Sequence, residues 1–164
     1  MKIKLSILLL FVSFVILFSL PSCTKDTTTT ITKTDTVIAA SLTKSQILVQ
    51  KSPWKIEQIV QDLGGTVTEY DRGGTNTTGQ NFDIVRFTFN ADGSGSNTDG
   101  DGNVFSMTWQ FTNADQNAIA LVINANPVVT GTWTLVTITD STISQTNTAT
   151  QGALESATLV PVNN

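Results

Sequence analysis

The segment NVFSMTWQF, residues 103–111, alternates large apolar side chains with polar or smaller ones, and this alternation constrains the fold more than any other feature. Phe105, Met107, Trp109 and Phe111 occupy every second position. Because successive side chains of a β-strand point to opposite faces of the sheet, a period of two predicts a strand. We therefore expect four large apolar side chains on one face, directed into a core.

Similar runs recur through the chain from residue 54 onwards, and turn residues separate them. The clearer runs are 54–61, 82–89, 118–124, 129–138, 141–148 and 153–162, and the weaker ones are 66–70 and 93–98. Clusters of Asn, Asp, Gly and Pro between the runs are typical of hairpin turns. Eight or nine short strands without a helical crossover predict an all-β, antiparallel meander. Closure into an up-and-down barrel would remove the exposed edges, and a two-layer β-sandwich is the alternative.

A short helix is expected ahead of the first strand. Thr43 and Gln46 have the spacing of a capping box before three apolar residues, so the pattern predicts a helix over residues 43–51 that ends before Pro53. The helix and the strands together span residues 43–164, a length sufficient for one domain with a single core.

Residues 1–22 have the pattern of an export signal. Two early lysines precede an apolar stretch over residues 5–20, and the small residue Ser22 stands directly before the single cysteine of the chain. Residues 20–23, LPSC, resemble the lipobox of bacterial lipoproteins. The resemblance implies that Cys23 becomes the acylated first residue of a lipoprotein anchored in the outer membrane, facing the periplasm or the cell surface. A buried free cysteine or an uncleaved helical anchor is the alternative.

Residues 23–42 are expected to form a tether between the lipid anchor and the domain. Eight of the thirteen residues from 24 to 36 are threonine, and almost nothing in this stretch is apolar. The apolar surface is too small to offset the entropy lost on ordering, so the composition predicts a disordered spacer.

Several features of the folded part resemble the lipocalin-like domain carried by many lipoproteins of Bacteroidota. Trp54 opens the first strand, F-T-F-N-A-D-G spans residues 87–93, W-x-F spans residues 109–111, and G-T-W spans residues 131–133. The resemblance covers most of residues 43–164. It implies a small lipocalin-like barrel that carries a small apolar or amphipathic ligand.

Six large side chains in the alternating strands are candidate ligand-binding residues: Trp54, Phe105, Met107, Trp109, Phe111 and Trp133. Core filling is the alternative role, because each of them has apolar neighbours two positions away. An eight-stranded barrel is just wide enough either to be filled by side chains or to hold one small ligand. The two functional hypotheses are therefore a membrane-tethered binding module and a structural or protein-interaction module of the cell envelope with a solid core.

The sequence offers few of the residue types and motifs that enzymes use for catalysis. The sequence contains no histidine and assigns its single cysteine to lipid attachment, and Gly-x-Ser-x-Gly and phosphate-loop patterns are absent. We therefore expect no enzyme, no catalytic residues and no cofactor. Acidic residues gather in the segment 92–103, but their spacing does not match an EF-hand, so two hairpin turns are predicted there in place of a metal site.

The charge of the chain argues against a nucleic-acid partner. The sequence carries 9 basic and 13 acidic side chains, a formal net charge of −4, and loss of Lys2 and Lys4 with the export signal makes the mature chain more acidic. Phosphate binding requires a basic patch, which this composition does not provide. The expected partners are the membrane, through the N-terminal acyl chains, and a small apolar ligand.

Overall fold

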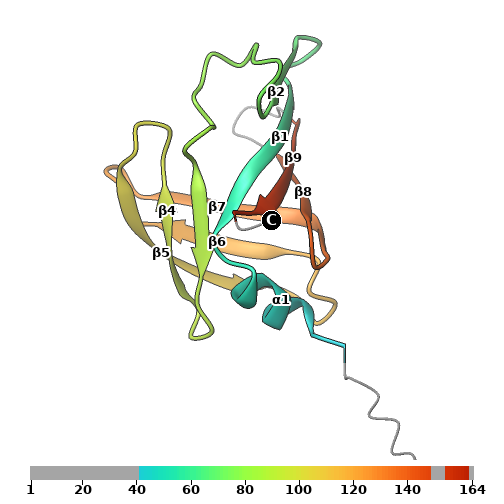
Figure 1. Ribbon diagram of the computed structural model, residues 1–164, viewed down its shortest axis with the longest axis vertical. Coiled ribbons are helices and arrows are strands. Elements are labelled where there is room, and N and C mark those ends of the chain that lie inside the picture. The colour runs from blue at the N-terminus through green and yellow to red at the C-terminus, as the bar shows by residue number, and fades with distance from the viewer. Residues whose placement is uncertain (1–40, 149–153, 163–164) are drawn as a thin grey trace, which may run out of the picture. The chain divides into compact units, whose positions relative to one another are not determined.

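The structure is a computed structural model, and it describes residues 41–148 and 154–162 of the chain (Figure 1). The predicted export signal, the predicted acylation site Cys23 and the predicted tether as far as residue 40 lie outside the described residues. Within the described ranges, no helix has the length and apolar character required to cross a membrane.

One antiparallel sheet forms the body of the domain. Its strands are β1 (Trp54–Asp62), β2 (Val67–Asp71), β3 (Arg86–Phe89), β4 (Ser94–Thr98), β5 (Val104–Phe111), β6 (Ile119–Ile123), β7 (Val129–Ile138), β8 (Ile143–Thr148) and β9 (Leu154–Pro161). The sheet runs in the order β2-β1-β3-β4-β5-β6-β7-β8-β9, and β1 also pairs with β9. Strands β1 and β3 to β9 thus close an eight-stranded barrel, to which β2 adds one further strand. The predicted antiparallel meander and barrel are confirmed, and the closed pairing rules out the alternative β-sandwich.

Strand β1 changes its partner half-way along its length. Trp54 and Lys55 pair with β3, whereas the residues from Gln58 to Asp62 pair with β2. Because β2 occupies this edge of β1, the predicted strand over residues 82–89 is only half formed. Residues 86–89 make β3, and residues 82–85 belong to the long loop that connects β2 to β3.

Helix α1 (Lys44–Gln50) closes one end of the barrel. The predicted capping box is present, because the Thr43 side chain accepts from the Gln46 backbone N–H at 3.2 Å and the Gln46 side chain accepts from the Thr43 backbone N–H at 2.9 Å. The helix buries Ile47 and Leu48 in the core. Its Lys44 ammonium donates to backbone carbonyls of the β5–β6 connection, which ties the helix to this end.

At the opposite end of the barrel, the residues that the structure describes form turns and one long loop, and we call this end the mouth. It comprises the β1–β2 turn, the β2–β3 loop and the β4–β5 and β6–β7 turns, which lie away from α1 (Figure 1). The alternation along each strand directs every second residue inward, and these residues form one core. Among the described residues, the two ends therefore differ, since a helix covers only the end at α1.

Candidate ligand site in the barrel

Aromatic rings fill the half of the interior that lies next to α1. Phe89 and Trp109 meet edge to face with ring centroids 5.4 Å apart, and Trp109 meets Phe111 at 5.8 Å. Phe87 and Trp133 meet at 5.2 Å, although they come from β3 and β7, which are four positions apart in the ring of eight strands. Their contact therefore crosses the barrel. We call these five residues the aromatic floor.

Hydrogen bonds fix two of the three buried tryptophans, Trp54 and Trp109, in place. The Trp54 indole N–H donates to the carbonyl of Leu48 in α1 at 2.9 Å. The Trp109 indole N–H donates to the carbonyls of Asn90 and Ser94, at 3.1 and 3.0 Å. Because a buried indole N–H without a partner would be costly, these bonds define one orientation for each ring. Within the floor, the ring of Trp109 is thus held in one orientation.

Space remains inside the barrel above the floor, beside Gly131 on β7. Gly131 pairs with Leu121, whose side chain is buried, so a Cβ atom at residue 131 would point inward. Such an atom would meet no heavy atom of the described residues within 4 Å. On β4 the situation is the opposite, since a Cβ atom at Gly95 would collide with the Thr88 carbonyl oxygen and approach the Met107 methyl group to 3.0 Å. Glycine within a strand often marks a position that a ligand approaches closely.

The mouth is rimmed by apolar side chains. Among the described residues, seven of the ten large apolar side chains that are exposed lie at this end: Leu63, Val67, Ile84, Val104, Val128, Val129 and Leu154. Just inside the rim, Phe105 and Ile123 face the interior and are only partly buried. A surface cleft of ≈ 450 Å³ also lies at this end, between loop residues 79–82 and turn residues 99–101. The mouth therefore presents apolar surface and a cleft to the solvent.

One inner wall of the barrel near the mouth is polar. It is formed by Gln61 on β1, Gln145 and Asn147 on β8, and Glu155 on β9, and we call it the polar wall. Gln145 is 5% exposed, and its Oε1 atom has no hydrogen-bond partner among the described residues. Gln61 donates to the Glu155 carboxylate at 2.7 Å. The upper interior thus combines apolar surface with amide and carboxylate groups.

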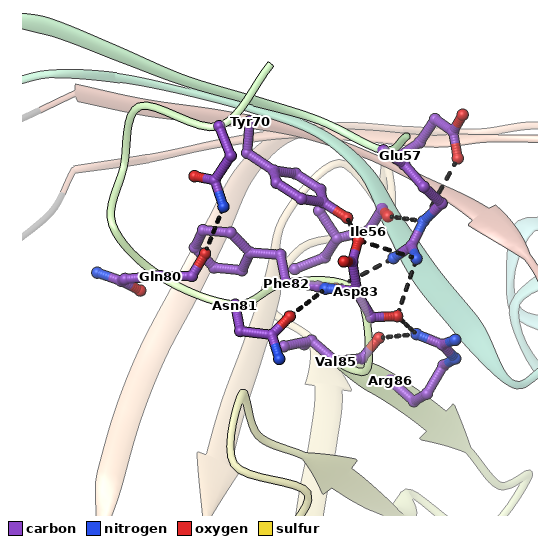
Figure 2. A network of polar contacts seen from close by, with 11 residues as sticks. Ile56, Glu57, Tyr70, Gln80, Asn81, Phe82, Asp83, Val85 and Arg86 are labelled. Atoms are coloured by element: carbon purple, nitrogen blue, oxygen red, sulfur yellow. Dashed lines mark hydrogen bonds and ion pairs between the residues drawn. The ribbon is translucent and has the colours of Figure 1, made fainter. Parts of the chain in front are cut away.

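Arg72 and Tyr70 hold the long β2–β3 loop against β1, and Figure 2 shows the network around them. The Arg72 guanidinium donates to the carbonyls of Ile56, Asp83 and Phe82, at 2.7, 2.8 and 3.0 Å. The Tyr70 hydroxyl donates to the Asp83 carboxylate at 2.7 Å. Burial, together with this hydrogen bond, raises the pKa of Tyr70 to about 12. The loop therefore forms a fixed part of the mouth.

Arg86 lies near this network on the outer face of β3, the side on which solvent exposure is expected. Its guanidinium donates to the carbonyls of Asp83 and Val85, at 2.8 and 2.7 Å, and is only partly exposed (Figure 2). Burial lowers the pKa of Arg86 from its ordinary value. Its inward neighbours on the strand are Phe87 and Phe89, so the side chain does not enter the barrel.

The acidic segment 92–103 forms two hairpin turns, as predicted. The Asp92 carboxylate accepts from the hydroxyl and backbone N–H of Ser94, at 2.6 and 2.9 Å, and the hydroxyl bond above all lowers its pKa. The Asp99 carboxylate accepts from the side chain and backbone of Asn103, at 3.0 and 2.8 Å, and its pKa is also lowered. The part of the chain that the structure describes contains no group of three or more His, Cys, Asp or Glu residues arranged to hold a metal ion.

All six candidate ligand-binding residues face the interior, but the structure separates them. Trp54, Met107, Trp109 and Trp133 are buried, and Phe111 packs against the core cluster. Phe105 alone lies at the mouth, beside the exposed rim. The residues that sequence reasoning missed are Gly131 and the polar wall. The signal for the wall was available, because Gln145 alternates with Ile143, and Glu155 with Leu159, both of which are buried.

Comparison with protein-family models, with curated proteins and with solved structures finds no match to this chain. The function is accordingly argued from the geometry of the barrel.

Proposed function

We propose that this chain is a lipoprotein tethered to the outer membrane through an acylated Cys23, with the lipocalin-like character that its sequence features suggest, and that its barrel binds one small apolar or amphipathic molecule. The observation that carries the binding proposal is the open space beside the inward-facing Gly131, together with the apolar side chains exposed at the mouth. A barrel of eight strands has room for one small ligand at most.

The apolar part of the ligand would lie against Phe105, Ile123 and the backbone at Gly131. Removing apolar surface from water contributes about 25 cal/mol for each Å² buried, and this term would supply most of the affinity. The aromatic floor is already packed and hydrogen-bonded, so little ordering accompanies binding. A tethered module of this kind would keep a poorly soluble molecule close to the membrane.

A second candidate is a structural or protein-interaction module whose solid barrel presents an outer surface to a partner. The contact of Phe87 with Trp133 across the barrel favours this reading, because it shows that half of the interior is closed to ligands. Leu135 favours it as well, since it projects from a bulge in β7 with φ 50° and is 74% exposed. This candidate predicts that the barrel binds no small molecule.

A matched pair of substitutions on β7 separates the two candidates. In Gly131→Leu the new side chain would fill the interior space, whereas in Thr132→Leu it would point outward from the neighbouring position. We expect the neutral fluorescent probe N-phenylnaphthylamine to bind the wild type saturably, and Gly131→Leu to weaken binding about tenfold, equivalent to 1.4 kcal/mol. Thr132→Leu should bind as the wild type does. Absence of saturable binding to the wild type, or equal affinities in the two variants, would reject the interior site.

A further inference from the structure

Gln145 presents a buried hydrogen-bond acceptor that nothing in the described structure satisfies. Ile143, Gln145 and Asn147 alternate along β8, and Ile143 is fully buried, so all three side chains face the interior. Gln145 is 5% exposed, and its Oε1 atom finds no partner among the described residues. Buried amides without partners are uncommon in folded proteins, and each one calls for a physical explanation. A ligand that donates a hydrogen bond to Oε1 would provide it.

Glu155 adds a second acceptor next to this amide. Asn147 pairs with Glu155 and Gln145 pairs with Ala157, so Gln145 and Glu155 are diagonal neighbours on one face of the sheet. Such neighbours are about 7–8 Å apart, and Ala157, directly opposite Gln145, has only a small side chain. One polar end of a small molecule is large enough to reach both groups.

The Glu155 carboxylate accepts a hydrogen bond from Gln61, and one of its oxygen atoms can accept a further bond. The Thr68 hydroxyl donates to Gln61 Oε1 at 3.3 Å, and Gln61 Nε2 donates in turn to Glu155 Oε2 at 2.7 Å. Glu155 Oε1 has no hydrogen bond within the described part of the chain. Even if the two amide atoms of Gln145 were exchanged, the carboxylate would still accept only, so the wall as a whole requires donors.

Among the described residues, no basic side chain lies on β8 or β9, the strands that carry Gln145, Asn147 and Glu155. The five basic side chains of the described residues lie on α1 and its C-cap or on the β1–β3 side of the barrel: Lys44, Lys51, Lys55, Arg72 and Arg86. The two ion pairs found among the described residues both engage Arg72, with Glu57 and Asp83 as partners. An anionic head group placed against Glu155 would therefore meet a like charge, and no basic side chain of the described part of β8 or β9 would compensate it.

We propose that the polar wall selects an amphipathic ligand whose polar end donates hydrogen bonds and carries no negative charge. Hydroxyl and amine head groups share this chemistry, whereas free carboxylates and phosphates do not. The polar end lies between Gln145 and Glu155, and the apolar chain extends towards Phe105 and Gly131. This inference rests on the proposed ligand-binding function and deepens it by naming the class of head group.

The test compares ligands that share one alkyl chain length and differ in the head group. The full chain carrying Cys23→Ser, in which no acyl chain competes for the barrel, is loaded with N-phenylnaphthylamine. Tetradecanol, monomyristin, tetradecylamine and myristic acid then displace the probe, each below its aggregation concentration. We expect the alcohol, the monoacylglycerol or the amine to bind at least about tenfold more tightly than myristate, the difference that corresponds to one charge-assisted or buried hydrogen bond. A preference for the amine alone would assign the selection to Glu155, and an equal preference for the alcohols would assign it to both acceptors.

Two inward substitutions and one outward control complete the design. Gln145→Leu and Glu155→Gln should each reduce the preference for donor head groups over myristate about tenfold. Gln145→Leu should also melt at the wild-type temperature or above it, because it removes an unsatisfied buried group. Gln110→Leu makes the same change on the outer face of β5 and should alter neither affinity nor preference.

The possible failures are distinguishable. If the wild type binds neither the probe nor any of the four ligands, the proposed function is rejected, and the head-group inference falls with it. If the probe binds but myristate competes as well as tetradecanol, or Gln145→Leu keeps the full preference, the head-group inference is rejected and the ligand-binding function stands.

Discussion

Replacing Arg72 with lysine should loosen the barrel at the point where β1 changes partner. In the wild type, one guanidinium satisfies the carbonyls of Ile56, Phe82 and Asp83 through three separate N–H groups, at distances between 2.7 and 3.0 Å. Ile56 lies on β1 at the junction, and the other two carbonyls belong to the β2–β3 loop. A lysine ammonium is a compact donor on a flexible stem and cannot reproduce this planar fork. At least two of the three carbonyls would lose their protein partner.

The expected cost follows from those lost bonds. A hydrogen bond to a charged group contributes about 1.5–3 kcal/mol, and bonds made by one side chain are not additive, so losing two should cost about 2–4 kcal/mol. The contacts of Arg72 with Glu57 and Asp83, at 3.7 and 3.8 Å, add little, because both carboxylates are well exposed and such pairs contribute about 0–1 kcal/mol. A lysine would in addition retain part of that attraction.

Urea unfolding followed by tryptophan fluorescence measures this cost, with Arg86→Lys as the matched control. Arg86 also donates to two carbonyls, but both lie within three residues of it in sequence, so its loss should cost less than about 1.5 kcal/mol. A free energy of unfolding for Arg72→Lys within about 0.5 kcal/mol of the wild type would refute the argument. A cost no larger than that of Arg86→Lys would refute it as well.

Four further predictions address the remaining parts of the account. Cys23→Ser should release the protein from the membrane fraction, and pelleting after a carbonate wash would contradict the lipid anchor. Deletion of residues 24–40 should leave the melting temperature unchanged within error, and a fall of several degrees would show that this segment contributes to the fold. Calcium titration should release no measurable heat, because the aspartates at the β3–β4 and β4–β5 turns are engaged in turn hydrogen bonds, and millimolar or tighter binding would contradict this. Tyr70, the single tyrosine of the chain, should titrate near pH 12 in the folded protein, because burial and the hydrogen bond to Asp83 raise its pKa. Its contribution to stability is complete below about pH 10 and is lost as the pH rises towards 12, and a tyrosinate absorbance midpoint near 10 would contradict both the burial and the bond.

The strands were predictable from the sequence because their signal is local. Each of the nine predicted runs overlaps a strand, since the alternation needed to bury one face is present within the run itself. The sequence did not distinguish a barrel from a sandwich. The deciding contact is the pairing of β1 with β9, the first and last strands of the domain, and these lie far apart in the sequence. The segment 82–85 was wrongly included in a strand for a related reason. Its alternation is real, but β2 takes the edge of β1 that it would need.

The sequence predicted which side chains face the candidate site, but it did not predict the shape of that site. Alternation placed Phe105, Met107, Trp109 and Phe111 on the inner face, and the structure agrees. Whether such side chains fill the barrel depends on the sizes of the residues that meet across it, such as Phe87 and Trp133. The sequence of one strand does not show which residues of other strands it will meet. Gly131 is an example. The space beside it depends on the positions of side chains from several strands, which its own strand does not reveal.

The measurement that tests the central claim most directly is a crystal structure of the Cys23→Ser chain with a brominated tetradecanol. The account predicts anomalous bromine density inside the barrel, above the aromatic floor and beside Gly131, with the hydroxyl within hydrogen-bonding distance of Gln145 Oε1 or of the Glu155 carboxylate. An interior without the ligand, or bromine density confined to the outer surface around Leu135, would contradict it.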